Sequence, residues 1–172
     1  MTRRRRQLPT ALAEATIESL SHEGRGVSHI DGKTVFIDGA LPGETVRFKY
    51  TGSRSRFAEG FAVEIDNPSE LRVTPGCTYF GVCGGCSLQH MHAEAQILHK
   101  QQVLFEQLKY IGGVEPAEKL APLTGQVWAY RHKARLGVKN VLKKGKVLVG
   151  FREKNKPYIA DIDSCEVLHS AI

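Results

Sequence analysis

Four cysteines constrain the fold of this chain more than any other feature of its sequence. Cys77, Cys83 and Cys86 form a C-x5-C-x2-C cluster, and Cys165 follows far downstream. After the basic N-terminus, acidic residues alternate with apolar ones where an export signal would be continuously apolar, so we expect a cytoplasmic protein. Disulfides are rare in that reducing compartment. The cysteines are therefore predicted to be metal ligands or a redox site.

Three clustered thiolates and one distant thiolate suit a [4Fe–4S] cubane, because each iron takes one ligand from a different direction. Glycines between the cysteines would let the loop wrap closely and aim backbone N–H groups at sulfur. Zinc is an alternative, although structural zinc usually has two short ligand pairs and only His169 lies near Cys165. A redox thiol or incidental cysteines are the third alternative. The predicted cluster ligands are Cys77, Cys83, Cys86 and Cys165.

A helix is predicted behind the cysteine loop. Apolar residues recur at helical spacing from Ile97 to Ile111, and Gly112-Gly113 ends the pattern. His90 and His92 precede this helix and could be metal ligands. Since four cysteines already suffice for a cluster, we expect both histidines to be surface residues at the start of the helix.

The first third of the chain has the two-residue period of half-buried strands. Asp31-Gly32 is a strong hairpin signal, because a tight turn needs positive φ and these residues tolerate it. Short strands with close turns indicate a small β-barrel. The expected strands are 13–18, 27–30, 33–37, 46–50 and 61–65.

A polar connection with two prolines over residues 67–76 is a plausible domain boundary. Beyond Pro122 the two-residue period returns, and it predicts an antiparallel sheet whose hairpin turn lies at Lys143-Lys144-Gly145-Lys146. The fold class is thus mainly β with one helix (α+β). The expected strands here are 130–139, 147–152 and 158–162. The expected divisions are a basic flexible tail over 1–11, a barrel over 12–67 and a cysteine-rich domain over 68–172.

The positive charge gathers in one part of the chain. The net charge is +6, and ten Lys or Arg residues lie between Arg131 and Lys156 against the single acid Glu153. A solvated strand can carry such a face without a ligand. Like charges in succession repel each other, however, and a polyanion would neutralise them, which favours RNA.

A second candidate for RNA contacts is the loop between the last two strands of the barrel. Arg54 and Arg56 lie there near Tyr50 and Phe57, where they could bind phosphates or stack on bases, although an ordinary polar loop would look the same. The predicted RNA-binding residues are Arg131, Lys133, Arg135, Arg54, Arg56, Lys143 and Lys144.

Three runs of sequence resemble known proteins. The run from Gly24 to Phe36 is similar to a TRAM domain, an OB-like RNA-binding barrel. The runs F-G-V-C-G-G-C, ending at Cys86, and Y-R-H-K-A-R-L, starting at Tyr130, resemble the bacterial 23S rRNA uracil-5-methyltransferases of the RlmD/RumA type. The resemblance extends from about Ala15 to Cys165. His132 departs from the residues often found at its position, so it is assigned no RNA contact.

The resemblance implies a [4Fe–4S] cluster on the four cysteines and 23S rRNA as the partner. In the family, a further domain binds S-adenosylmethionine and methylates a flipped-out uridine through a cysteine nucleophile. This sequence offers no spare thiol and no glycine-rich cofactor turn, so we expect no catalytic residue and no S-adenosylmethionine site in this chain. We expect either a truncated enzyme or a free-standing module, monomeric and without a membrane partner.

Two other functions fit parts of the sequence. One is an independent RNA-binding protein without enzymatic activity, acting as a chaperone or ribosome-associated factor. The other is a radical methylthiotransferase, since these enzymes also combine TRAM barrels with clusters. Their cluster motif is C-x3-C-x2-C and their barrel follows the enzyme domain, whereas here Cys77 to Cys83 is C-x5-C and the barrel comes first.

Overall fold

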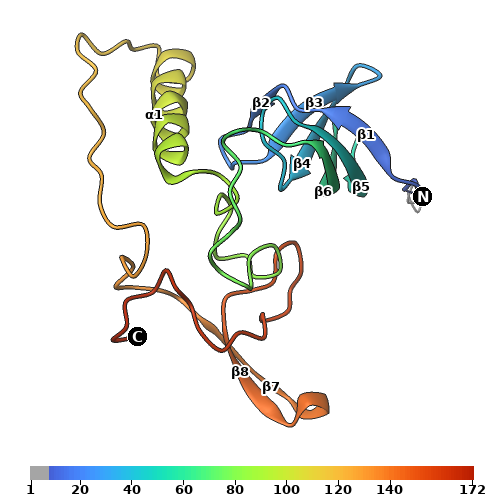
Figure 1. Ribbon diagram of the computed structural model, residues 1–172, viewed down its shortest axis with the longest axis vertical. Helices are drawn as coiled ribbons and strands as arrows, with labels where there is room; N and C mark the ends of the chain where they lie inside the picture. The colour runs from blue at the N-terminus through green and yellow to red at the C-terminus, as the bar shows by residue number, and fades with distance from the viewer. Residues whose placement is uncertain (1–7) are drawn as a thin grey trace. The chain divides into compact units, whose positions relative to one another are not determined.

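The computed structural model describes residues 8–172 and divides into two compact units, one up to Arg72 and one from Val73 onward (Figure 1). The first seven residues of the expected basic tail lie outside the described residues. As predicted, the fold is mainly β with one long helix. Each unit is described by itself below.

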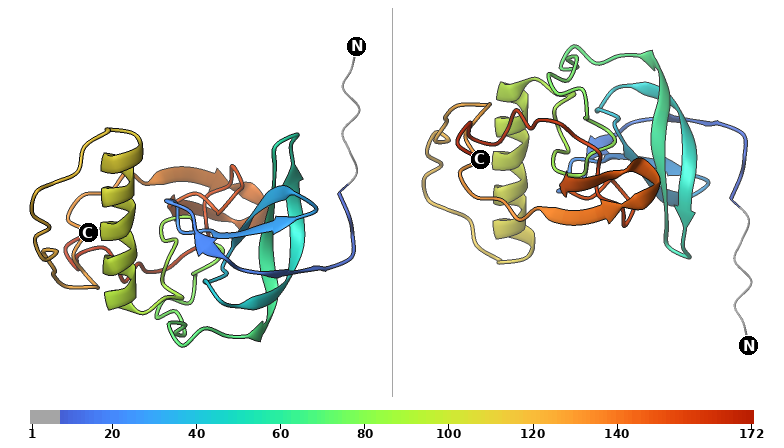
Figure 2. Two further views of the ribbon diagram at one scale, coloured as in Figure 1. Left: turned by 90° about the horizontal axis from the view of Figure 1, so that it is seen from above. Right: turned by 90° about the horizontal axis from the view of Figure 1, so that it is seen from below.

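The first unit is a curled, six-stranded sheet. Its strands are β1 (Ala13–Thr16), β2 (Ser19–Leu20), β3 (Gly26–Ile30), β4 (Lys33–Asp38), β5 (Thr45–Ser53) and β6 (Phe57–Asn67). The strand order is β1-β5-β6-β4-β3-β2, with β4 and β6 parallel. Because β1 and β2 are consecutive in the chain but stand at opposite ends of this order, the sheet closes on itself as a small barrel (Figure 2).

The core of this unit follows from the alternation of its strands. Val46 and Phe48 of β5 are fully buried, and they pack in one cluster with buried side chains from β1 and β4. On β6, Phe61, Val63 and Ile65 alternate in the sequence and would share one face of a regular strand, but Ile65 packs against the core whereas the other two do not. Phe61 is 41% exposed and Val63 is exposed as well, whereas Ala58 is buried. The hairpin at Asp31-Gly32 forms as predicted, with positive φ at both residues.

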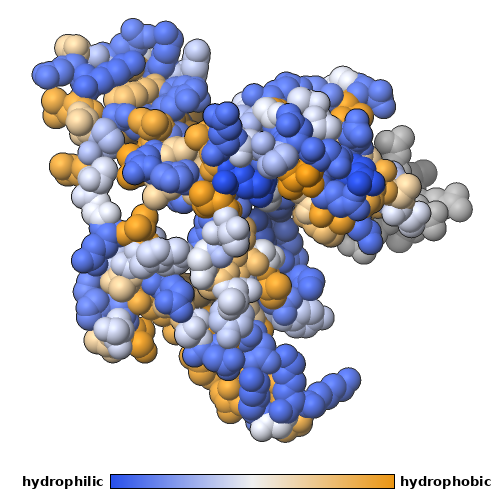
Figure 3. Space-filling view, viewed as in Figure 1, coloured by the Kyte–Doolittle hydropathy of each residue, from blue (hydrophilic) through white to orange (hydrophobic). Residues whose placement is uncertain are grey.

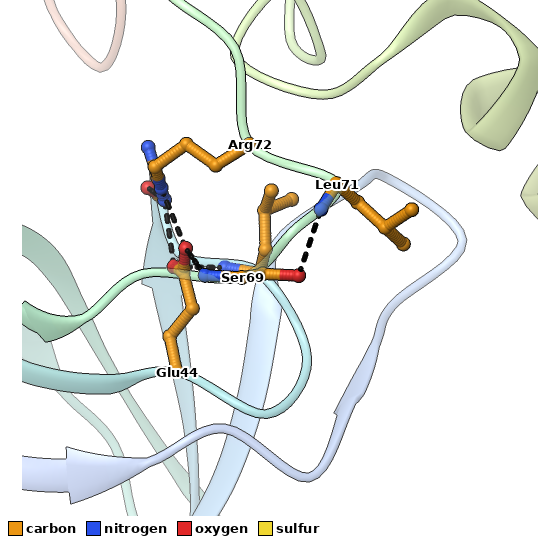
Figure 4. Close-up of polar contacts among 6 residues, drawn as sticks. Glu44, Ser69, Leu71 and Arg72 are labelled. Carbon is orange, nitrogen blue, oxygen red and sulfur yellow. Dashed lines mark hydrogen bonds and ion pairs between the residues drawn. The ribbon is translucent and has the colours of Figure 1, made fainter.

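A buried carboxylate holds the end of the first unit in place (Figure 4). Glu44 is fully buried and accepts hydrogen bonds from the backbone N–H groups of Leu41 at 2.8 Å and Ser69 at 3.0 Å. Arg72 donates to both carboxylate oxygens, at 2.5 and 2.7 Å, and to the carbonyl of Gly39 at 2.7 Å. The chain after β6 is thereby attached to the barrel as far as Arg72.

The second unit contains the predicted helix, α1 (Ala93–Tyr110). The helix ends where the glycine pair was expected to end it: the N–H of Gly112 donates to the carbonyl of Gln107, and Gly113 has a φ of 64°. None of the residues Ala93–Tyr110 is buried. Apolar side chains lie exposed on the helix and on the segment after it (Figure 3).

The second sheet is a single antiparallel hairpin, β7 (Gly137–Val141) and β8 (Lys146–Gly150), joined by a 3-10 turn over Leu142–Lys144. The antiparallel pairing and the turn were predicted, but the strand expected over 130–139 begins only at Gly137. The strand expected over 158–162 is reduced to one bridge between Arg152 and Ile159. The alternation of residues predicted longer strands. The backbone of Arg131, however, pairs with the C-terminal segment at one isolated bridge, and no strand continues from it.

Within residues 8–172, no helix has the length and apolar character needed to cross a membrane.

Candidate metal centre and basic surface

The side chains of four cysteines line one small cavity in the second unit. Three come from the loop after Pro75, and the fourth comes from the C-terminal segment. All four thiols are free and partly buried. Tyr79, Phe80 and Phe151 contribute aromatic walls to the same cavity. The structure therefore brings together the residues that the sequence singled out: Cys77, Cys83, Cys86 and Cys165.

Turns made by its own backbone shape the cysteine loop. The N–H of Phe80 donates to the carbonyl of Cys77 at 3.1 Å, and the N–H of Cys83 donates to the carbonyl of Tyr79 at 2.9 Å. The N–H of Gly85 points at the sulfur of Cys83, at 3.4 Å. This is the N–H to sulfur contact that the glycines in the loop were expected to allow.

The loop docks on the chain just after β8, and two glycines make the close approach possible. The N–H of Gly84 donates to the carbonyl of Arg152 at 2.8 Å, and a Cβ on Gly84 would lie 2.9 Å from that oxygen. A Cβ on Gly85 would lie 3.0 Å from the ring of Phe151. A side chain at either position would push the loop away from its support.

A separate set of contacts fixes the segment that carries Cys165. The hydroxyl of Tyr79 lies 3.2 Å from both the N–H and a carboxylate oxygen of Asp163. Arg131 donates its backbone N–H to the carbonyl of Val167 at 3.1 Å, and its own carbonyl accepts from His169 at 3.1 Å. The fourth cysteine is thus held on both sides by residues from elsewhere in the unit.

Burial raises the pKa of the Cys83 and Cys86 thiols. The N–H of Gly85 opposes the shift at Cys83, and hydrogen bonding to Gln89 opposes it at Cys86, while the neighbouring cysteines add to it. A metal would therefore have to displace protons from these thiols. Within residues 8–172, no three His, Cys, Asp or Glu side chains form a group that could hold a single metal ion.

Of the two histidines behind the loop, one lies where it was expected and the other does not. His92 is exposed and pairs with Glu94 at 2.6 Å. His90 is 2% exposed, and its ring packs against Phe80 at 5.5 Å between centroids. The expectation that His90 is a surface residue was wrong, because its ring lies against Phe80 of the cysteine loop and it is buried together with Met91.

The basic residues after Tyr130 have different surroundings. Arg131 lines the cysteine cavity, and its guanidinium lies 5.3 Å from the ring centroid of Phe151. It therefore does not share the exposed face expected for it with Lys133 and Arg135, which are exposed. Lys143 and Lys144 are exposed in the hairpin turn, and Lys144 pairs with an aspartate, Asp161, at 2.7 Å.

In the barrel, Arg54 and Arg56 are exposed in the turn between β5 and β6. The guanidinium of Arg54 lies 5.7 Å from the ring of Phe57. Tyr50 instead packs on buried Phe48, with 4.8 Å between the two ring centroids, so its ring lies against the core.

Sequence reasoning missed Phe61, an exposed aromatic side chain paired across the sheet with Lys49. The bulges along β5 and β6 shift the register there, and simple alternation gives no signal of such shifts.

Comparison with known proteins gives three kinds of match. Residues 12–63 match the TRAM domain family. The 23S rRNA (uracil(1939)-C(5))-methyltransferases RlmD of Alcanivorax borkumensis and Alkalilimnicola ehrlichii are 60% and 56% identical to this chain over 168 residues each. Each match covers 98% of this chain and 38% of the relative, so the chain spans well under half the length of these curated relatives.

A solved structure is also similar. The crystal structure of Pyrococcus abyssi tRNA (uracil-54, C5)-methyltransferase in complex with S-adenosyl-L-homocysteine matches with a TM-score of 0.60 and 25% identity. The match covers 92% of this chain and 33% of that one.

Proposed function

Since this chain carries a TRAM domain and is homologous to the N-terminal part of the RlmD-type 23S rRNA uracil-C5-methyltransferases, we propose that it is the RNA-recognition and [4Fe–4S]-binding part of such an enzyme. Methyl transfer from S-adenosylmethionine is assigned to the remainder of a full-length enzyme, and no catalytic residue is assigned to this chain. We further propose that it acts in the cytoplasm, as a monomer, on 23S rRNA.

The observation that carries the proposal is the shared cavity of the four cysteines. Four thiolates are a complete ligand set for a cubane, and each would bind a different iron. The loop glycines allow close wrapping, and the N–H of Gly85 points at the sulfur of Cys83, a contact of the kind that tunes iron–sulfur clusters. A cluster closed by four thiolates leaves no open iron, so its role in this chain is to cross-link the cysteine loop to the C-terminal segment.

Metal analysis of protein purified without oxygen tests this assignment. We expect iron and acid-labile sulfide in equal amounts, and a broad visible absorbance that disappears in Cys83→Ser. A conservative control is Ser87→Ala, which changes an exposed residue beside the loop. Stoichiometric zinc without iron would overturn the cluster assignment and leave a single-ion site in its place.

For RNA binding we propose two exposed basic groups. The first lies around the hairpin of the second unit and consists of Lys133, Arg135 and Lys143. The second lies in the barrel turn at Arg54 and Arg56, beside the partly buried ring of Phe57. Lys144 was predicted as a further contact, but its ammonium already has Asp161 as a partner, so we expect it to contribute less.

The salt dependence of RNA binding tests these groups. Replacing Lys133 and Arg135 with Glu should weaken binding to an rRNA fragment, and the slope of log affinity against log salt should become less steep by about one for each phosphate that the variant no longer binds. Lys100→Glu, at an exposed lysine on α1, is compared with the single variant Lys133→Glu, because each of these two changes the net charge by the same amount. An equal effect in both variants would mean that binding depends on net charge and not on this surface.

A further inference from the structure

We propose that Arg131 is a positioning residue of the cysteine centre, where its guanidinium offsets the negative charge of the bound cluster, and that it is not one of the RNA contacts. The proposal rests on the cluster assignment made above. It departs from the pattern of the sequence, in which Arg131 is the first of a row of alternating cations.

The first argument is where the side chain lies. Arg131 lines the cavity together with all four cysteines, and it is partly buried. Lys133 and Arg135, two and four positions later, are exposed. A cation that contacts RNA phosphates must be accessible from solvent, and Lys133 and Arg135 are more accessible than Arg131.

The second argument is how firmly the side chain is held. Its guanidinium stacks over the ring of Phe151, with 5.3 Å to the centroid, and that same ring fits against Gly85 of the cysteine loop. Its Nε donates to the carbonyl of Lys133 at 3.2 Å. The backbone hydrogen bonds of Arg131 to Val167 and His169 fix its position beside the segment of Cys165.

The third argument is charge. Four thiolates carry more negative charge than the iron–sulfur core carries positive charge, so the bound cluster is an anion. A partly buried anion is costly unless a cation or hydrogen-bond donors lie near it. Arg131 is the basic side chain among the described residues lining this cavity, whose other charged member is the exposed Glu166. Nearby charge and hydrogen bonding are also what set the potential of such clusters.

The test compares Arg131→Met and Arg131→Lys in the whole chain, loaded with iron and sulfide without oxygen. In Arg131→Met the reduction potential should become more negative, because reduction adds charge that no cation offsets. The cluster absorbance should also fall about tenfold or more faster with a chelator. Arg131→Lys should restore most of the potential, since it keeps the charge. RNA affinity and its salt slope should be unchanged in both.

Lys133→Met is the matched control, and it should alter the salt slope while leaving the cluster potential unchanged. A potential in Arg131→Met equal to that of the wild type would overturn the proposal, as would an equal shift in the Met and Lys variants, which would indicate packing instead of charge. A loss of RNA affinity in Arg131→Met with the cluster unaltered would return the residue to the RNA surface. Failure of the wild-type chain to take up iron would instead defeat the cluster assignment itself.

Discussion

The two units of this chain are stabilised in different ways. The first unit encloses a continuous core of buried apolar side chains from four strands, the residue that follows β1 and the turn after β4, namely Ala15, Ile17, Val35, Ile37, Ala40, Val46, Phe48 and Ala58. Among the described residues from Val73 onward, the buried side chains are His90, Met91, Leu148, Ala160 and Val167. These are scattered over the segment before the helix, one strand and the C-terminal loops.

The difference shows where each unit obtains its stability. Burial of apolar area is the main favourable contribution in a small domain, and the first unit has it. The second unit has a longer chain but few buried side chains, and α1 buries none of its residues Ala93–Tyr110. Small domains with little core depend on cross-links or metals, and the cysteine cavity is the place where distant segments of this unit meet.

The sharpest way to test this comparison is to remove one ligand of the proposed centre. Cys165→Ser should abolish hydrogen-exchange protection across the second unit, because structural metal sites in small domains contribute on the order of 10 kcal/mol of folding free energy. Protection of β1 to β6 should be unchanged. Exchange followed by mass spectrometry measures both units in one experiment, with Ser170→Ala, at an exposed position nearby, as the control. Equal loss in both units, or in neither, would contradict the comparison.

A smaller effect is expected when the buried ion pair of the first unit is broken. Glu44→Gln removes the negative charge that pairs with the guanidinium of Arg72, while it keeps the shape of the side chain. Breaking such pairs costs about 3 kcal/mol, since the remaining charge has lost its partner. Arg47 and Glu64 form an exposed ion pair on the same barrel, and Glu64→Gln should cost less than about 1 kcal/mol. Hydrogen-exchange protection of β5 measures both effects. Equal losses of protection in Glu44→Gln and Glu64→Gln would contradict the role of burial.

The same pair makes the stability of the first unit depend on pH. Burial raises the pKa of the Glu44 carboxyl, but hydrogen bonds from Arg72, Leu41 and Ser69 outweigh burial and hold the pKa below its usual value. A carboxyl with a lowered folded-state pKa stabilises the fold above its unfolded-state pKa, and this contribution is lost as the pH falls through the folded-state pKa. Acid should therefore destabilise the first unit, and Glu44→Gln should flatten that dependence.

How much the sequence predicted also differs between the units. In the first, alternation and the Asp31-Gly32 turn located every major strand, because each strand has one face on a shared core. On β6 the alternation is interrupted by bulges that reverse which side chains face inward, with Phe61 exposed as a result. Local sequence carries no mark of a bulge that depends on the partner strand.

In the second unit the motif was more informative than the periodicity. The spacing of Cys77, Cys83 and Cys86 singled out residues that the structure gathers in one cavity with Cys165. The strand expected over 130–139 forms only from Gly137 onward, because in a unit with so little core burial does not force charged and apolar residues onto opposite faces of a strand. For the same reason the alternation gave no sign that the side chain of Arg131 lines the cysteine cavity, where its guanidinium lies beside the ring of Phe151.

The smallest effect is expected on the exposed face of α1. Leu104 is 53% exposed on the helix, whereas Ile37 of β4 is fully buried in the barrel. Leu104→Ala removes little buried area and replaces leucine with the best helix former, so the free energy of unfolding of the second unit should change by less than about 0.5 kcal/mol. Ile37→Ala should cost the first unit about 2 to 5 kcal/mol through the cavity it leaves. If Leu104→Ala lowered exchange protection in the second unit as strongly as Ile37→Ala does in the first, α1 would have to be packed in solution, and this unit would then depend on a core of its own as well as on its cysteines.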